Sequence, residues 1–248
     1  MCYHTKHTKR VEQLEQRWDV LREKERFEIE DNDFYYNHAN GYSHPELLII
    51  PQEEPSVLHP SIWGIMPTKI KGIEQNDYYK KAIKFGGGLN AQSEKLFDHF
   101  IYKHSAFTRR CLVPMDGFYE PHTAPNKLKI PFLFKRKDDD LFAVAGIYNI
   151  SVDGFVTMTL LTKSASPLFA KVHNTKFRQP VLLRREFEND WLKDDLNENN
   201  IKEIINVNYP EDELETYPIS RDLFSTKIDS NRFDIAEKVN YPELNTLF

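Results

Sequence analysis

Cysteine, glycine and long apolar runs are scarce in this sequence. Its 248 residues include only two cysteines, Cys2 and Cys111, too few for a disulfide framework or a cysteine-rich zinc site. No apolar run has the length of a membrane span, and the charged N-terminus lacks the apolar segment of a signal peptide. These absences predict a protein of the cytoplasm with no membrane partner.

The nine glycines do not form a phosphate-binding motif. Three of them are consecutive, Gly86 to Gly88, but neither a GxGxxG pattern nor a Walker lysine is present. The sequence therefore gives no sign of a nucleotide cofactor, and we expect no cofactor or metal. The glycine run instead indicates a place where backbone approaches another group closely.

An overall positive charge, the usual mark of a nucleic-acid-binding protein, is also missing. The formal net charge is −5, but it is unevenly distributed. Residues 186–248 hold 16 acidic and 6 basic side chains, which leaves 22 acidic and 27 basic ones upstream. The first three quarters of the chain can therefore hold a phosphate backbone locally, which permits nucleic-acid binding without indicating it.

Short strand patterns separated by turn signals fill the middle of the chain. They predict a single α+β domain over residues 1–248, with curved antiparallel sheets forming an open, barrel-like core and helices at its flanks. The strand patterns lie at 47–50, 61–67, 111–113, 118–120, 130–135, 141–148 and 155–162.

Helical patterns are expected at both ends of the chain. Residues 9–30 form a charged segment in which Val11, Leu14, Trp18 and Leu21 recur at helical spacing. Residues 186–248 are acidic, and two helices there, at 185–196 and 199–206, precede a loop-rich tail that wraps the surface.

Cys2 is the most reactive position that the sequence offers. After removal of Met1 it carries an α-amine and a thiol on adjacent carbons, with ordinary pKa values of about 8 and 8.5. An amine and a thiol so placed can convert an aldehyde into a Schiff base and then into a thiazolidine ring. A cysteine in this position by chance is the alternative.

Three other side chains are candidate functional residues, and each also has a purely structural interpretation. Glu120 is flanked by aromatic residues at the start of a strand, where burial would raise its pKa toward that of an acid/base catalyst. His173 lies in a polar loop before a strand. Trp63 lies in a strand that ends at Pro67 and either stacks on a base or belongs to the core.

Four separated motifs occur in order along the chain. They are Met1-Cys2, Asn90-Ala91-Gln92-Ser93-Glu94, the stretch from Arg110 to Glu120, and His173 followed by Arg178, Pro180 and an aliphatic strand. This arrangement resembles the SOS response-associated peptidase (SRAP) family. That family has an N-terminal Met-Cys, an Asn-Ala-Arg-Ser/Ala-Glu motif, an Arg-Cys-Leu-hydrophobic-Pro-Ala-Asp-Gly-Phe-Tyr-Glu-Trp motif and a His before Arg-Met-Pro-Val-Ile-Leu. The resemblance covers Met1 to Leu183.

The resemblance implies an enzyme of DNA repair that crosslinks covalently to abasic sites in single-stranded DNA. Cys2 is then the nucleophile, Asn90 positions it, Glu120 moves the protons of its amine, and His173 serves the sugar oxygen as acid or base. DNA contacts are expected from the side chains Gln92, Arg110, Trp63 and Arg178. The chain departs from the family where Gln92 replaces an arginine, Pro121 a tryptophan and Gln179 a methionine.

Two other functions are compatible with the same residues. The first is a thiol peptidase in which Cys2, with Glu120 and His173, removes its own Met1 and then cleaves peptides. The crosslinking enzyme itself is expected to have autopeptidase or lyase-type activity. The second is a non-catalytic reader of modified bases, which would not need Cys2. The expected partner is single-stranded DNA with abasic sites, bound by a monomer that associates with the nucleoid.

Overall fold

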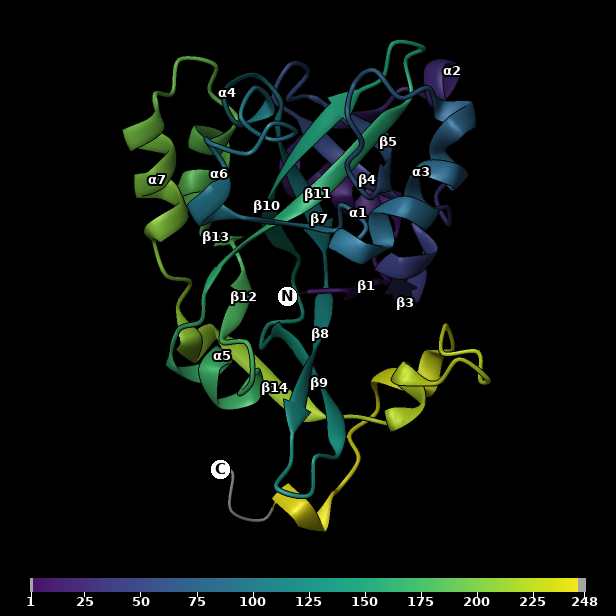
Figure 1. Cartoon of the computed structure of the whole chain (residues 1–248), viewed down its shortest axis with the longest axis vertical. Helices are drawn as coiled ribbons and strands as arrows, with labels where there is room; N and C mark the ends of the chain where they lie inside the picture. Colours follow the sequence, from purple (N-terminus) through teal and green to yellow (C-terminus); the bar gives the residue numbers. More distant parts are fainter. Residues whose placement is uncertain (1, 245–248) are drawn as a thin grey trace.

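Two sheets and the helices around them make up the fold, which we describe from a computed structural model for residues 2–244 (Figure 1). The helices are α1 (Val11–Trp18), α2 (Lys24–Phe27), α3 (Gln75–Ala82), α4 (Ser105–Thr108), α5 (Pro167–Val172), α6 (Arg185–Trp191) and α7 (Glu198–Asn206). The strands are β1 (His4–His7), β2 (Leu21–Arg22), β3 (Tyr36–Asn40), β4 (Glu46–Pro51), β5 (Val57–Trp63), β6 (Asn90–Gln92), β7 (Arg110–Met115), β8 (Gly117–Thr123), β9 (Lys129–Arg136), β10 (Phe142–Ile150), β11 (Val156–Ser164), β12 (Arg178–Pro180), β13 (Leu182–Leu183) and β14 (Leu214–Pro218).

The larger sheet closes on itself. Its order is β12-β11-β10-β7-β4-β5-β2, and β5 also pairs in parallel with β11, with Ile62 opposite Thr157. Strands β4, β5, β7, β10 and β11 therefore form a complete ring. This confirms the predicted α+β fold with a barrel-like core, and the β5–β11 pairing closes the barrel that the sequence suggested was open.

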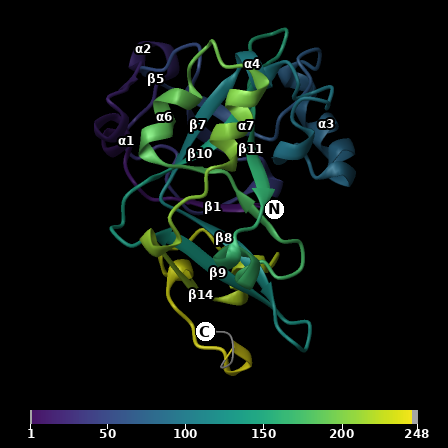
Figure 2. The same ribbon diagram turned by 90° about the vertical axis from the view of Figure 1, so that its left-hand side faces the viewer.

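The smaller sheet brings the beginning of the chain into the middle of the molecule. Its order is β14-β9-β8-β1-β3, so β1 is hydrogen-bonded to a strand on each side. In the register, His4 lies opposite both Asn40 of β3 and Tyr119 of β8. Figure 2 shows this sheet below the barrel, with β1 near the junction between them.

Alternate residues of the barrel strands enter two different apolar clusters. In β4, Leu47 and Ile49 pack in the cluster that contains Cys2, whereas Leu48 and Ile50 pack in the cluster that contains side chains of α1, α6 and α7. Figure 2 shows α6 and α7 over one face of the barrel. Because both faces are covered, the barrel strands read as nearly continuous apolar runs.

The predicted helical segment at 9–30 is present only in part, as two short helices, α1 and α2, with a strand between them. Val11 and Leu14 are buried as expected, but the helix ends at Trp18, and Asp19 adopts a left-handed conformation with φ of 52°. The chain then forms β2, which pairs with β5, and Leu21 is 69% exposed. The apolar residues keep their helical spacing past the turn at Asp19, and the charged residues around it do not reveal the turn in the sequence.

The C-terminal segment is only partly a wrapping tail. Its two predicted helices are present as α6 and α7, and Asn197 caps α7 with its side chain. The predicted loop beyond them instead contributes β14, which pairs with β9 over five residues. None of the helices within residues 2–244 is long and apolar enough to cross a membrane.

Arg110 ties three parts of the fold together from a fully buried position. Its guanidinium donates hydrogen bonds to the backbone carbonyls of Ala106, Phe107, Trp191 and Lys193. These carbonyls belong to the segment before β7 and to the end of α6. The structure therefore corrects the expectation that Arg110 contacts DNA, because all of its donor groups are directed inward.

We expect Arg110→Ala to unfold at markedly lower urea concentration than the wild-type protein. Hydrogen bonds to a charged group contribute about 1.5–3 kcal/mol each, and four carbonyls lose their donor, so a loss of at least about 3 kcal/mol follows. The exposed Arg221 is the control, and Arg221→Ala should change stability by less than about 0.5 kcal/mol. Equal unfolding midpoints for the two variants would contradict the structural role of Arg110.

Candidate active site

Cys2 is buried where the two sheets meet. Its side chain has no exposed surface, and its thiol lies 3.7 Å from the carbonyl oxygen of His4. On the edge that faces β3 the pairing continues to Tyr3, whose carbonyl accepts a hydrogen bond from the amide of Gly41. Burial, followed by the charge of Glu120, raises the pKa of the Cys2 thiol well above its ordinary value. The thiol is therefore protonated at neutral pH.

Glu120 faces the same cluster because of strand periodicity. It follows Phe118 by two residues in β8, and both side chains point to the face that also holds Cys2. Glu120 has no exposed surface, and burial raises its pKa to about 7. Its carboxyl is therefore able to hold or release a proton near neutral pH.

His173 meets Glu120 from the end of α5. Its Nδ1 lies 3.2 Å from Oε2 of Glu120 and 3.0 Å from the carbonyl oxygen of Arg178. A carbonyl oxygen only accepts, so Nδ1 carries the hydrogen and Nε2 carries the basic lone pair. Burial lowers the pKa of His173 to about 4, which keeps the ring neutral at physiological pH.

Asn174 holds the His173 loop against β8. Its side-chain oxygen accepts a hydrogen bond from the amide of Thr123, and its side-chain nitrogen donates to the carbonyl of the same residue. One residue earlier in β8, the ring of His122 hydrogen-bonds to the carbonyl of Val172. The sequence analysis missed both residues, although His122 follows Glu120 at strand spacing and Asn174 adjoins His173.

Asn90 reaches Cys2 from a third direction. Strand β6 runs parallel to β11, and the Asn90 side-chain nitrogen donates a 2.7 Å hydrogen bond to the carbonyl of Cys2. Its side-chain oxygen is buried and has no hydrogen-bond partner among residues 2–244. This oxygen is thus a free acceptor beside the cysteine.

The three consecutive glycines set the position of Asn90. Gly86, Gly87 and Gly88 all have positive φ, at 88°, 65° and 71°. A Cβ on Gly88 would lie 2.5 Å from the carbonyl oxygen of Ile65, so the loop passes closer to β5 than any other residue type allows. The indole of Trp63 then donates to the carbonyl of Leu89, one residue before Asn90.

The structure thus brings Cys2, Asn90, Glu120 and His173 to one buried place, from four separate segments of the chain. Asn90 contacts Cys2, His173 contacts Glu120, and the charge of Glu120 acts on the thiol of Cys2. No group of three metal-ligating side chains occurs in the part of the chain that the structure describes. Once Met1 is removed, the amine and thiol of Cys2 beside two proton carriers would suit condensation with a carbonyl compound.

The four side chains predicted to contact DNA have different environments. Trp63 is fully buried, so the structure corrects the idea that its ring stacks on a base. Arg178 forms a two-point ion pair with Glu94, at 2.6 and 2.9 Å, and also donates to the carbonyl of Thr162. Gln92 is partly exposed at the end of β6. The roles of Gln92 and Arg178 in DNA binding stay predictions.

Comparisons with known proteins identify similar chains. The model of a family described as SOS response associated peptidase (SRAP) matches residues 1–226. The abasic site processing protein YoqW of Bacillus subtilis is 30% identical over 172 residues, 68% of this chain and 71% of that protein. YoaM of the same organism, also named an abasic site processing protein, is 28% identical over 71% of this chain and 74% of its own length.

The fold also matches a solved structure. A crystal structure of a protein from Bacteroides thetaiotaomicron superimposes with a TM-score of 0.81 over 96% of this chain and 100% of that chain. The sequence identity of 23% is low, so this likeness concerns the fold. The arrangement of the sheets is therefore shared by proteins of widely differing sequence.

Replacing Gly88 by alanine should displace Asn90 from Cys2. The substitution combines a disfavoured φ with a collision against Ile65, and we expect a loss of about 1–3 kcal/mol in the free energy of unfolding. The side-chain amide NMR signals of Asn90 should shift as well. Gly154→Ala is the matched control, since Gly154 has a φ of 84° but open space around its Cα. Unchanged Asn90 signals in Gly88→Ala would refute this positioning role.

Glu120→Gln should change how stability depends on pH. Because burial raises the pKa of Glu120 to about 7, folding favours the protonated carboxyl, and this stabilisation is present below the unfolded pKa of about 4.3. It is lost as the pH rises through 7, which corresponds to about 3 kcal/mol. In urea unfolding, the variant should therefore gain about 3 kcal/mol relative to the wild-type protein between pH 4.5 and pH 8.

The control for Glu120→Gln is a carboxylate whose pKa is lowered in the folded protein. The ion pair with Arg178 lowers the pKa of Glu94, so Glu94→Gln should not gain stability over the same interval. Parallel stability curves for Glu120→Gln and the wild-type protein would show that the Glu120 pKa is not raised in the folded protein.

Proposed function

The chain belongs to the SOS response associated peptidase (SRAP) family, and from this premise we propose that it processes abasic sites in single-stranded DNA. The product is a covalent thiazolidine that joins the DNA to Cys2 once Met1 has been removed. Met1 lies outside the described residues. The observation that carries the proposal is the burial of Cys2 beside Asn90 and the Glu120–His173 pair. The relatives named abasic site processing proteins support the choice of substrate.

The proposed reaction begins at the amine of Cys2. The amine adds to the C1′ aldehyde of the ring-opened sugar, and the resulting carbinolamine loses one water to give an imine. The thiol then adds to the imine carbon, its proton passes to the nitrogen, and a five-membered ring closes. In sum, one aldehyde and one aminothiol give one thiazolidine and one water, with no oxidant or metal required.

Glu120 and His173 are suited to the proton transfers in these steps. With a pKa of about 7, Glu120 accepts a proton from the Cys2 ammonium and returns it to the departing hydroxyl. The Nδ1 hydrogen of His173 is held by the carbonyl of Arg178, so Nε2 takes up the proton of the C1′ hydroxyl and passes it to the sugar ring oxygen as the ring opens. Asn90 fixes the Cys2 carbonyl, and its open side-chain oxygen accepts a hydrogen bond from the amine or the sugar.

The state of the thiol favours crosslinking over general peptidase activity. A thiol peptidase depends on a stored thiolate, which requires a lowered pKa. Here burial raises the pKa of the Cys2 thiol instead. A protonated thiol still suits the proposed reaction, because the amine reacts first and the thiol attacks an activated imine.

A single strand and a single protein chain are sufficient for the proposed reaction. The aldehyde must enter a site in which Cys2 has no exposed surface, and extruding a sugar from the stacked helix costs least in single-stranded DNA. All four reacting and positioning residues come from one chain. We therefore propose that the protein acts as a monomer.

The test is the intact mass of the protein after incubation with a single-stranded oligonucleotide that carries one abasic site. We expect the protein to lack Met1 and to gain the mass of one strand less one water. Cys2→Ala should form no stable adduct. Cys2→Ser and Cys2→Ala both keep the α-amine once Met1 is removed, so each should form an imine that borohydride traps, but little product that persists without the reductant.

An unmodified oligonucleotide of the same length is the control for adventitious attachment. A stable adduct formed equally by Cys2→Ala would transfer the chemistry to another residue. Retention of Met1 with no adduct would refute the proposal at its centre, because the Cys2 amine would remain in a peptide bond.

A further inference from the structure

Two neighbouring pockets form one groove that the reaction above does not use. Their volumes are about 560 and 500 Å³, and both are lined by Pro67, Phe100 and Ile101. We call the combined feature the Phe100 groove. It runs along the segment after β5, α3 with its following turn, and the segment before α4.

One half of the Phe100 groove is aromatic. Phe85 and Phe100 line it and are 90% and 72% exposed, values that are unusual for such large apolar side chains. The ring of His99 stacks on Phe100 at 5.0 Å and on Tyr102 at 4.1 Å. This half of the groove therefore exposes the end of an existing stack of aromatic rings to solvent.

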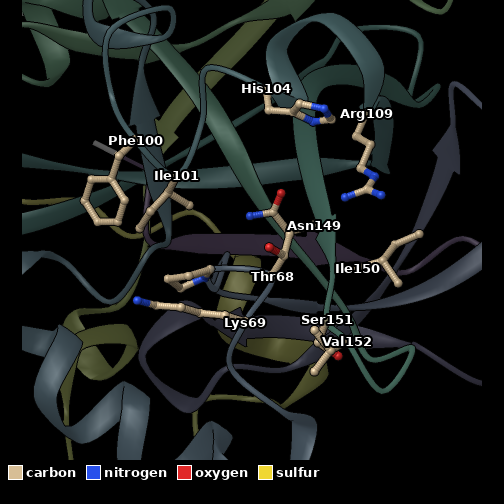
Figure 3. Close-up of a pocket in the computed structure, with 11 residues that line it drawn as sticks. Thr68, Lys69, Phe100, Ile101, His104, Arg109, Asn149, Ile150, Ser151 and Val152 are labelled. Carbon is tan, nitrogen blue, oxygen red and sulfur yellow. The ribbon is translucent and has the colours of Figure 1, made fainter.

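The other half is cationic. Lys69, His104 and Arg109 line it, and Figure 3 shows Lys69 at the lower edge of the pocket and the other two at the upper edge. Lys81 adds a cation to the aromatic half. None of the residues that line either half is acidic, although the chain as a whole carries a net charge of −5.

The guanidinium of Arg109 is incompletely paired, which supports an anionic ligand in the groove. Its Nε is buried and makes no hydrogen bond to any residue in the described range. The nearest carboxylate oxygen, on Glu53, is 3.8 Å away and belongs to a side chain that is 51% exposed. The guanidinium is therefore only partly neutralised and has capacity for an anion.

The groove begins close to Cys2. Gly88 lines its aromatic half and precedes Asn90 by two residues, a separation of at most about 7 Å along the chain. On the same loop, a Cβ at Gly86 would lie 4.0 Å from the hydroxyl of Tyr3. A ligand attached at Cys2 thus needs to cross only this loop to enter the groove.

We propose that the Phe100 groove binds the nucleotides that flank the abasic site on one side. Bases stack on Phe85 and Phe100, and phosphates contact Lys69, Lys81 and Arg109. Aromatic faces next to cations, without carboxylates, fit single-stranded nucleic acid, which presents both bases and phosphates along the strand. This inference rests on the proposed function, since that function supplies the strand and its attachment point.

The first test measures binding of unmodified single-stranded DNA, which requires no reaction at Cys2. Phe100→Ala and Phe85→Ala should each weaken binding by roughly 5- to 100-fold, the range for loss of one stacked base. Lys69→Ala and Lys81→Ala should each lower the slope of log affinity against log salt by about 0.7. The controls are Phe233→Ala, whose ring is 81% exposed in the C-terminal segment, and Lys227→Ala.

The second test uses abasic oligonucleotides with a long flank only on the 5′ or only on the 3′ side. Phe100→Ala should slow adduct formation with one of these substrates and leave the other unchanged. If both substrates react at wild-type rates and unmodified DNA binds normally, the groove does not bind DNA, and a peptide ligand becomes the alternative. If the wild-type protein forms no adduct at all, the proposed function fails, whatever the groove variants do.

Discussion

The hydrogen bonding of β1 on both of its edges is the constraint on which the site depends. Chain ends usually fray, but here the strand that begins at His4 is an inner member of a sheet. That position carries Cys2 into the apolar cluster between the sheets, where Asn90 holds its carbonyl. Cys2 is thereby held in place and away from solvent, as the proposed covalent chemistry at one defined atom requires.

Burial then sets the charge of every group around Cys2. It disfavours ionised forms, so the pKa values of the thiol and of Glu120 rise while that of His173 falls. At neutral pH the thiol and His173 are uncharged, and Glu120 is close to its point of half-ionisation. The core therefore tolerates three titratable groups without a network of buried ions, and one of them still exchanges protons readily.

Much of the fold was predictable, and the errors have physical causes. Strand patterns and the buried Val11 and Leu14 were recognised because periodicity reports which face is apolar. The predicted helical segment is interrupted after Trp18 because spacing alone does not reveal the left-handed turn at Asp19. Strand β14 was missed because its residues form a strand only by pairing with β9, more than 70 residues earlier. Trp63 and Arg110 suit DNA by residue type, but the fold uses their donors for backbone carbonyls.

The sequence by itself determined which groups are available: a thiol at Cys2, a carboxyl at Glu120, an imidazole at His173, and a glycine run before Asn90. The covalent structure of the chain fixes the type of each residue. The motifs and their order can therefore be read without the fold. Only the tertiary structure decided that these groups meet, which tautomer His173 adopts, and that Phe85 and Phe100 remain exposed beside cations. Distances, burial and pKa values depend on neighbours that are remote in sequence, and folding alone brings those neighbours together.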